Sequence, residues 1–306
     1  MRKFIGLTKR NLLVYFKDKA AILFSMLTSL IVLVLYLLFL KGTFVDAFNS
    51  SIQVAPGLDM FISAEDVEVF ANITLLIGML GSAMITVSYS SLTTIVKDRE
   101  DKIDYDISAT PVKRWQIILS YFCAASISSC VMTGILLAAG MIILGLNGGL
   151  LLGAADILKA FGMVILGSVS ATALFMTLMV FFKTAQSSSA FFGMLSAAAG
   201  FVIGAYIPIS QFSENVQTFC NLFPATHVTV AVRNILMRGV LDKMNDSLGG
   251  VDGGLFIESI KETFSFSSRM FGHSFEMSQS IVYIVAIIAV SVVFMIAAFS
   301  KTYKRT

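Results

Sequence analysis

The stretch SQSIVYIVAIIAVSVVFMIAAFS, residues 278–300, contains no Asp, Glu, Lys or Arg. A helix of about 20 apolar residues is long enough to cross the hydrocarbon core of a bilayer. One Asp, Lys or Arg at the centre of such a helix costs about 2.5–3.5 kcal/mol on insertion. An uncharged stretch of this length therefore predicts a helix that spans a membrane.

Five earlier stretches share this composition and are almost free of charge: residues 20–40, 69–96, 115–145, 157–182 and 188–208. The whole chain is 57% apolar and only 13% charged, whereas soluble domains carry about 25% charged residues. The sequence therefore predicts an all-α integral membrane protein, a single domain over residues 1–306 with six transmembrane helices.

Basic residues are concentrated in alternate connecting segments. Segments 1–19, 97–114, 183–187 and 301–306 hold 15 Lys and Arg in 48 residues, whereas segments 41–68, 146–159 and 210–277 hold 7 in 110. Short segments rich in Lys and Arg stay on the cytoplasmic side. We therefore expect a multi-pass protein of the cell (plasma) membrane with both termini in the cytoplasm. Lipid headgroups account for the net charge of +3, so no nucleic-acid partner is expected.

Residues 1–19 predict an amphipathic helix. Ile5, Leu12 and Phe16 share one face, and the basic residues lie largely on the opposite face (Arg2, Lys3, Lys9, Arg10 and Lys17). A basic amphipathic helix beside a span usually lies in the plane of the headgroups. We expect an interfacial helix, which serves either as a simple membrane anchor or as a platform for a cytoplasmic partner.

Segment 97–114, KDREDKIDYDISATPVKR, is the one sizeable cytoplasmic loop that the span pattern predicts, and it balances five acidic against five basic residues. Ile103 and Ile107 are one helical turn apart and predict a small apolar contact face. Thr110 and Pro111 predict a helix start, with Thr as the N-cap and Pro at the first position. This charge balance suits recognition by another protein; the alternative is a solvated loop that joins two spans.

Segment 210–277 is the largest part expected on the outer side. Residues 226–238 predict a helix that Thr226 caps and Gly239 ends. The predicted helix is too short to span a bilayer and too apolar on one side to float free, so a re-entrant or interfacial position is expected. Residues 255–277 are expected to form a small outer cap.

Motifs for catalysis and metal binding are absent from the sequence. It contains no G-x-x-x-x-G-K-[ST] phosphate loop, no H-E-x-x-H pair and no Cys/His cluster with metal spacing. We therefore predict no catalytic residue, no metal site and no cofactor bound by this chain, which is not an enzyme by itself. No span centre carries the ionisable residue that ion-coupled transporters use.

Four features of the sequence give a family resemblance: the N-terminal amphipathic helix, acidic residues 98–101 followed by ATPVKRWQII at 109–118, IPI at 207–209, and NLFPAT at 221–226 with Arg233 downstream. With these features in this order, the chain resembles the permease subunit of ATP-binding cassette (ABC) transporters of the type-2 exporter class. Residues 239–277 form a longer outer stretch than the simplest members have.

The resemblance implies a translocation path between two permease copies, or between this chain and a paralogue. A separate ABC ATPase subunit, which carries ATP and Mg, would bind each copy through the N-terminal helix and a short coupling helix within 97–114. Segment 210–239 would close the exit, and the origin would be prokaryotic. The residues implied in ATPase coupling are Asp98, Arg99, Glu100, Asp101, Ile103, Ile107, Thr110 and Pro111, and those in the outer gate are Pro208, Pro224 and Arg233.

The resemblance also turns the second and fifth predicted spans toward the path. Their large soft side chains could offer a surface to a hydrophobic or amphipathic cargo, with the hydroxyl of Thr86 beside it: Met79, Met84, Phe191, Phe192, Met194 and Phe201. Ordinary packing or lipid contact is the alternative for each of these side chains. For the whole protein, the alternatives are a carrier or channel without ion coupling, and a membrane scaffold or sensor that transports nothing.

Overall fold

The computed structural model describes residues 2–52, 62–146, 151–249 and 253–302. Within these residues, five helices are long and apolar enough to cross a membrane. They are α2 (Lys19–Leu35, continued by the π-helical η1, Tyr36–Leu40), α4 (Ala64–Glu100), α6 (Arg114–Leu146), α7 (Ala154–Met179) and α13 (Met277–Thr302). The predicted all-α membrane fold is confirmed, and each of these helices overlaps one predicted span.

The fifth predicted span, residues 188–208, corresponds to a shorter helix, α8 (Ala185–Val202). The helix ends because Gly204 adopts a left-handed backbone conformation, with φ of +72°. The backbone N–H groups of Ala205 and Tyr206 then donate back to the carbonyl of Gly200, at 2.8 and 3.3 Å. The ring of Tyr206 folds over Gly200, where a Cβ would lie 2.2 Å from the ring. The predicted number of six spans depends on α8 and stays a prediction.

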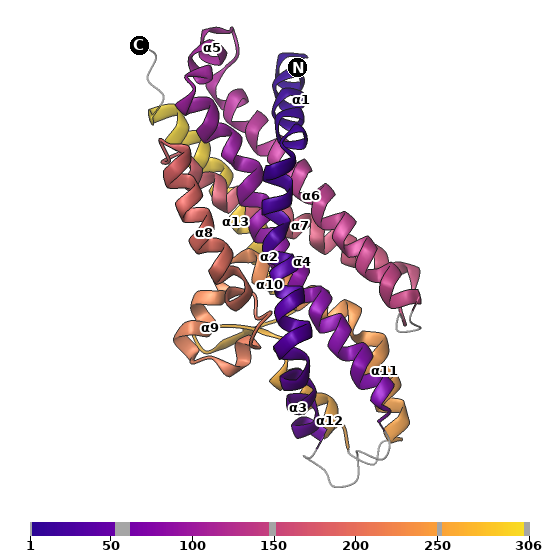
Figure 1. Ribbon diagram of the computed structural model, residues 1–306. Helices are drawn as coiled ribbons and strands as arrows, with labels where there is room; N and C mark the ends of the chain where they lie inside the picture. The colour runs from indigo at the N-terminus through magenta and orange to yellow at the C-terminus, as the bar shows by residue number, and fades with distance from the viewer. Residues whose placement is uncertain (1, 53–61, 147–150, 250–252, 303–306) are drawn as a thin grey trace.

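Helix α4 is the centre of the bundle. Of its most apolar stretch, 78% is buried, compared with 17% for α13. It packs against α2, α6, α7 and α8, which surround it in Figure 1. Because α4 touches so many neighbours, a displacement of α4 must move them or break its contacts with them.

The two ends of the bundle carry different short elements. Figure 1 shows α1 (Arg2–Lys17), α5 (Ile103–Ala109) and the last turns of α13 at one end, and α3 (Lys41–Ile52), α11 (Arg238–Leu248) and α12 (Leu255–Thr263) at the other. Segment 210–277 also contains η3 (Ile209–Gln211, which begins one residue earlier), α9 (Glu214–Asn221) and an antiparallel hairpin, β1 (Ser268–Met270) with β2 (His273–Phe275). The sequence predicted a small outer cap over residues 255–277 but did not predict α9, α12 or the hairpin.

Helix α10 (Pro224–Leu236) replaces the helix predicted over 226–238. Thr226 is not its cap: Pro224 occupies the first helical position, where the missing N–H costs nothing, and the Thr226 hydroxyl donates to the carbonyl of Cys220 at 2.8 Å. Gly239 is not its end, because α11 begins at Arg238. Every residue of α10 except Asn234 is buried, and the helix packs against α4, α7 and α13. The re-entrant course stays a prediction.

Candidate coupling site and membrane cleft

The last turn of α4 is a junction at which four consecutive side chains, residues 97–100, bind different parts of the protein. Lys97 pairs with Asp18 at 2.9 Å. Asp18 also caps α2 by accepting the backbone N–H of Ala21 at 2.9 Å. The N–H of Ala21, and then the contact with Lys97, lower the pKa of Asp18. Lys97 thereby ties the start of α2 to α4.

Asp98 is buried, with 4% of its surface exposed, and it binds two other helices. The guanidinium of Arg10, on α1, donates to both carboxylate oxygens, with 2.7 Å between Nη2 and Oδ1. The hydroxyl of Tyr121, on α6, donates to Oδ2 at 2.5 Å. The hydrogen bonds that Arg10 donates to Asp98 raise the pKa of Arg10. A buried carboxylate is tolerated when it is paired and hydrogen-bonded in this way.

Arg99 and Glu100 bind the connection between α7 and α8. Arg99 donates to the carbonyls of Val180, at 3.1 Å, and Phe182, and Glu100 accepts the backbone N–H of Ala185 at 2.7 Å. The ends of helices leave such carbonyls and N–H groups without partners. A cation at a helix C-terminus and an anion at a helix N-terminus also complement the helix dipole.

One further contact completes the junction. Arg114, the first residue of α6, donates to the carbonyl of Ser300 near the end of α13 at 3.1 Å. Segment 97–114 therefore holds α2, α6, α7, α8 and α13 by polar contacts at one end of the bundle. The sequence did not reveal Arg10, Lys97, Tyr121 or Arg114 as partners, because their bonds join positions far apart in the chain.

Segment 97–114 presents its remaining predicted residues in two directions. Ile107 is buried and Ile103 packs against the same core, so these two side chains face inward. Asp101, Thr110 and Pro111 are exposed, as is Tyr105 on α5. The short helix α5 lies where the resemblance implied a coupling helix. Contact between these residues and an ATPase stays a prediction.

The helix start predicted at Thr110 is wrong. Thr110 is the C-cap of α5, and its hydroxyl donates to the carbonyl of Ile107 at 2.6 Å. Helix α6 begins at Arg114. The side chain of Gln116 accepts the N–H of Lys113 at 3.1 Å, so the next helix is capped three residues later than the Thr-Pro pair suggested.

The residues predicted for a cargo path do not lie on one surface. Met84 and Thr86 have no exposed area, and the hydroxyl of Thr86 donates to the carbonyls of Ser25 and Ser82. Met79 is half-buried against the core. Met194 and Phe201 are exposed on α8. Met84 and Thr86 therefore follow the alternative of ordinary packing that the sequence left open.

Phe191 and Phe192 are half-buried and pack on Tyr89 of α4, each with 5.6 Å between ring centroids. Phe192 also lines a cleft of about 370 Å³ between α2, α4 and α8. The cleft has Phe24 on its apolar side, Lys97 and Asp18 at its charged end, and four hydroxyls along it: Ser90, Thr93, Ser188 and Ser189. Its lining is therefore amphipathic. The charged residues, Asp18 and Lys97, lie toward the end of α4 that is followed by α5.

Of the residues predicted for an outer gate, Arg233 binds Ser265 directly, and Pro208 lies two residues before Ser210, which also binds Ser265. Arg233 is buried, with 4% of its surface exposed, and donates to the carbonyl of Ser265 at 2.7 Å. The hydroxyl of Ser265 accepts the N–H of Ser210, two residues after Pro208, at 2.8 Å. Pro224 is buried in the first turn of α10. Among the described residues Arg233 has no acidic partner, so its charge is held by backbone alone.

A bundle of long apolar helices, with a polar junction at one end and short folded elements at the other, defines a multi-pass membrane protein. Residues 50–299 match the model of the family described as ABC-2 family transporter protein. The chain belongs to this family of membrane transport components, as the sequence resemblance indicated. A search of curated proteins found no match.

Proposed function

We propose that this chain is the permease subunit of an ATP-driven exporter that works with a separate ABC ATPase. In this proposal the chain crosses the membrane six times with both termini in the cytoplasm, α10 is a re-entrant helix, and two permeases pair. The observation that carries it is the junction at residues 97–114, where side chains hold α2, α6, α7, α8 and α13.

The contacts of this junction divide the segment into two roles. Asp98, Arg99 and Glu100 are occupied within the chain, so they transmit movement to the spans. The exposed side chains of Asp101, Tyr105 and Pro111 are left to meet the ATPase. When nucleotide binding displaces the ATPase, the contact would push α5, and the spans tied to α4 and α6 would swing together.

The cleft between α2, α4 and α8 supports an amphipathic cargo. Its aromatic side chains suit an apolar body, and its hydroxyls and charged pair suit a polar head. The cleft lies at the end of α4 that carries the junction, so this cargo would enter from the cytoplasmic side of the membrane.

The test of coupling is purification of the chain from native membranes in mild detergent, with identification of the proteins that accompany it. The expected result is a stoichiometric ATPase. Replacing Tyr105 and Pro111 with alanine should remove this ATPase while the permease stays folded. The matched control is Val216→Ala, an exposed apolar side chain in the outer part, which should retain the ATPase. A chain that purifies without any ATPase, even after cross-linking, contradicts the proposal.

A further inference from the structure

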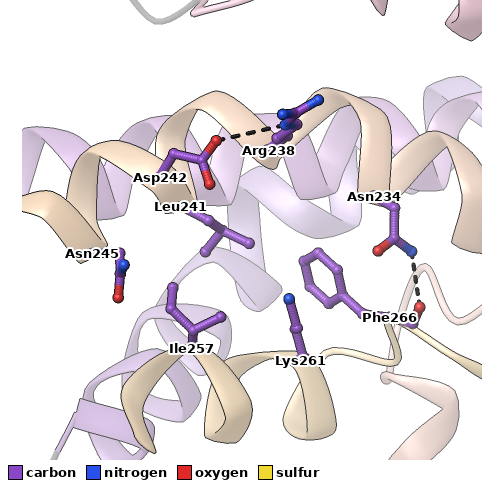
Figure 2. Close-up of a pocket in the computed structure, with 8 residues that line it drawn as sticks. All are labelled: Asn234, Arg238, Leu241, Asp242, Asn245, Ile257, Lys261 and Phe266. Atoms are coloured by element: carbon purple, nitrogen blue, oxygen red, sulfur yellow. Dashed lines mark hydrogen bonds and ion pairs between the residues drawn. The ribbon is translucent and has the colours of Figure 1, made fainter. Parts of the chain in front are cut away.

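A pocket of about 330 Å³ lies in the outer part of the protein, between α11 and α12 (Figure 2). Its volume is in the range of small-molecule sites. Helix α11 lines it with one face, because Arg238, Leu241, Asp242 and Asn245 are three or four positions apart. Ile257 and Lys261 face them from α12, and Asn234 and Phe266 complete the lining. The pocket is separate from the junction and from the membrane cleft.

Contacts that do not involve a ligand fix the walls of this pocket. Asn234 donates to the carbonyls of Val230 and Phe266, at 2.9 and 2.8 Å. The neighbouring Arg233 holds Ser265, so two adjacent side chains of α10 clamp the turn that carries Phe266. Leu241 and Phe266 are themselves buried. The apolar floor is therefore built before any ligand arrives, which reduces the entropy lost on binding.

The polar groups around this floor have unused bonding capacity. Figure 2 shows the Asn234 side-chain oxygen on the pocket side, with its nitrogen turned to Phe266, and the Lys261 ammonium pointing from α12 toward α11. Lys261 forms no ion pair with any residue whose placement is described. Arg238 and Asp242 are 3.6 Å apart and about two-thirds exposed. The pocket lining thus contains two cations, Arg238 and Lys261, and one carboxylate, Asp242, which leaves an excess of positive charge in the lining.

We infer that this pocket binds a small amphipathic monocarboxylate with an N–H group beside its apolar body. The carboxylate meets Lys261 and Arg238, the N–H donates to the Asn234 oxygen, and the apolar body covers Leu241, Ile257 and Phe266. Asp242 disfavours a second negative charge on the ligand. An acylated hydrophobic amino acid has this chemistry, and so has the carboxyl end of a short hydrophobic peptide.

The first test is calorimetric titration of the full chain in nanodiscs with N-acetyl-L-leucine, with empty nanodiscs as the blank. Saturable binding is expected, and N-acetyl-L-leucinamide, which lacks the carboxylate, should bind at least about threefold more weakly. The dipeptide leucyl-leucine separates the two sources of the ligand. If it binds as tightly as N-acetyl-L-leucine, a peptide end is favoured; weaker binding favours the acylated amino acid. No saturable binding, or equal binding of acid and amide, overturns the inference.

The second test uses variants of Lys261 that remove or keep its positive charge. Lys261→Ala should weaken binding of N-acetyl-L-leucine by about threefold, and Lys261→Arg should restore it. The matched control is Lys159→Ala, which removes an exposed lysine that pairs with Asp156 and does not line the pocket, and it should bind as the unaltered chain does. Unchanged binding by Lys261→Ala contradicts the assignment. This titration needs no ATPase, so its result is independent of the proposed coupling.

Discussion

At the scale of single residues, Asp98 is expected to contribute strongly to the free energy of unfolding. Asp98→Asn leaves the Arg10 guanidinium without its counter-charge and removes an acceptor from Tyr121. Breaking a fully buried ion pair costs about 3–5 kcal/mol, and because the Arg10 side chain is 33% exposed we expect a loss of about 2 kcal/mol in unfolding free energy. Denaturation in detergent measures it. Asp101→Asn, an exposed change in the same segment, should have almost no effect; an equal loss in both variants refutes the buried pair.

The contacts of Asp18 predict that the free energy of unfolding depends on pH. Its carboxylate is stabilised by the N–H of Ala21 and by Lys97, which lower its pKa. A carboxyl group whose pKa is lowered by folding contributes stability above its unfolded pKa, near 4, and loses it as the pH falls through the folded value. Asp18→Asn should therefore unfold more easily than the unaltered chain at pH 7, by about 1 kcal/mol. The difference should vanish in acid; a difference that stays constant with pH would show that the charge is not responsible.

At the scale of elements, α8 contains two glycines with opposite surroundings. At Gly200 an added Cβ would lie 2.2 Å from the Tyr206 ring, whereas at Gly193 nothing lies within 4 Å. Gly200→Ala should reduce the free energy of unfolding by about 1–3 kcal/mol through overpacking. Gly193→Ala should increase it by up to about 1 kcal/mol, because alanine favours helix. Thermal unfolding of the two variants compares them, and a destabilised Gly193→Ala would indicate that another surface packs against this face.

The five long apolar helices were predictable to within a few residues, because the cost of placing charge in a bilayer keeps such stretches nearly free of charged residues. The end of α8 was not predicted. Helix ends were less predictable. Thr110 and Thr226 both have the composition of an N-cap, yet Gln116 and Pro224 set the actual starts of α6 and α10. The contacts of the junction could not be predicted from the sequence. Asp98 was among the candidate residues, but Arg10 and Tyr121 contact it only because α1 and α6 pack against α4.

At the scale of the whole molecule, the junction predicts that distant segments respond together. If the proposed ATPase binds α5, nucleotide binding by it should change hydrogen exchange in parallel at α5, at the connection 180–185 and near Ser300, because residues 97–114, which include α5, bond to both of the other regions. The hairpin β1–β2, which packs against α9, serves as the control and should change less. A response confined to α5 would indicate that the contacts do not carry movement into the bundle.

The last turn of α4, residues 97–100, also determines how this chain tolerates a change in length. An inserted residue turns the following part of a helix by about 100° and shifts it by about 1.5 Å. One residue inserted just before Lys97 would therefore misdirect all four side chains at once, although the apolar composition of the span would hardly change. This turn of α4 therefore sets the rotational register of the helices that it binds, and we expect insertions or deletions to be accepted in the connections at the opposite end of the bundle but rejected here.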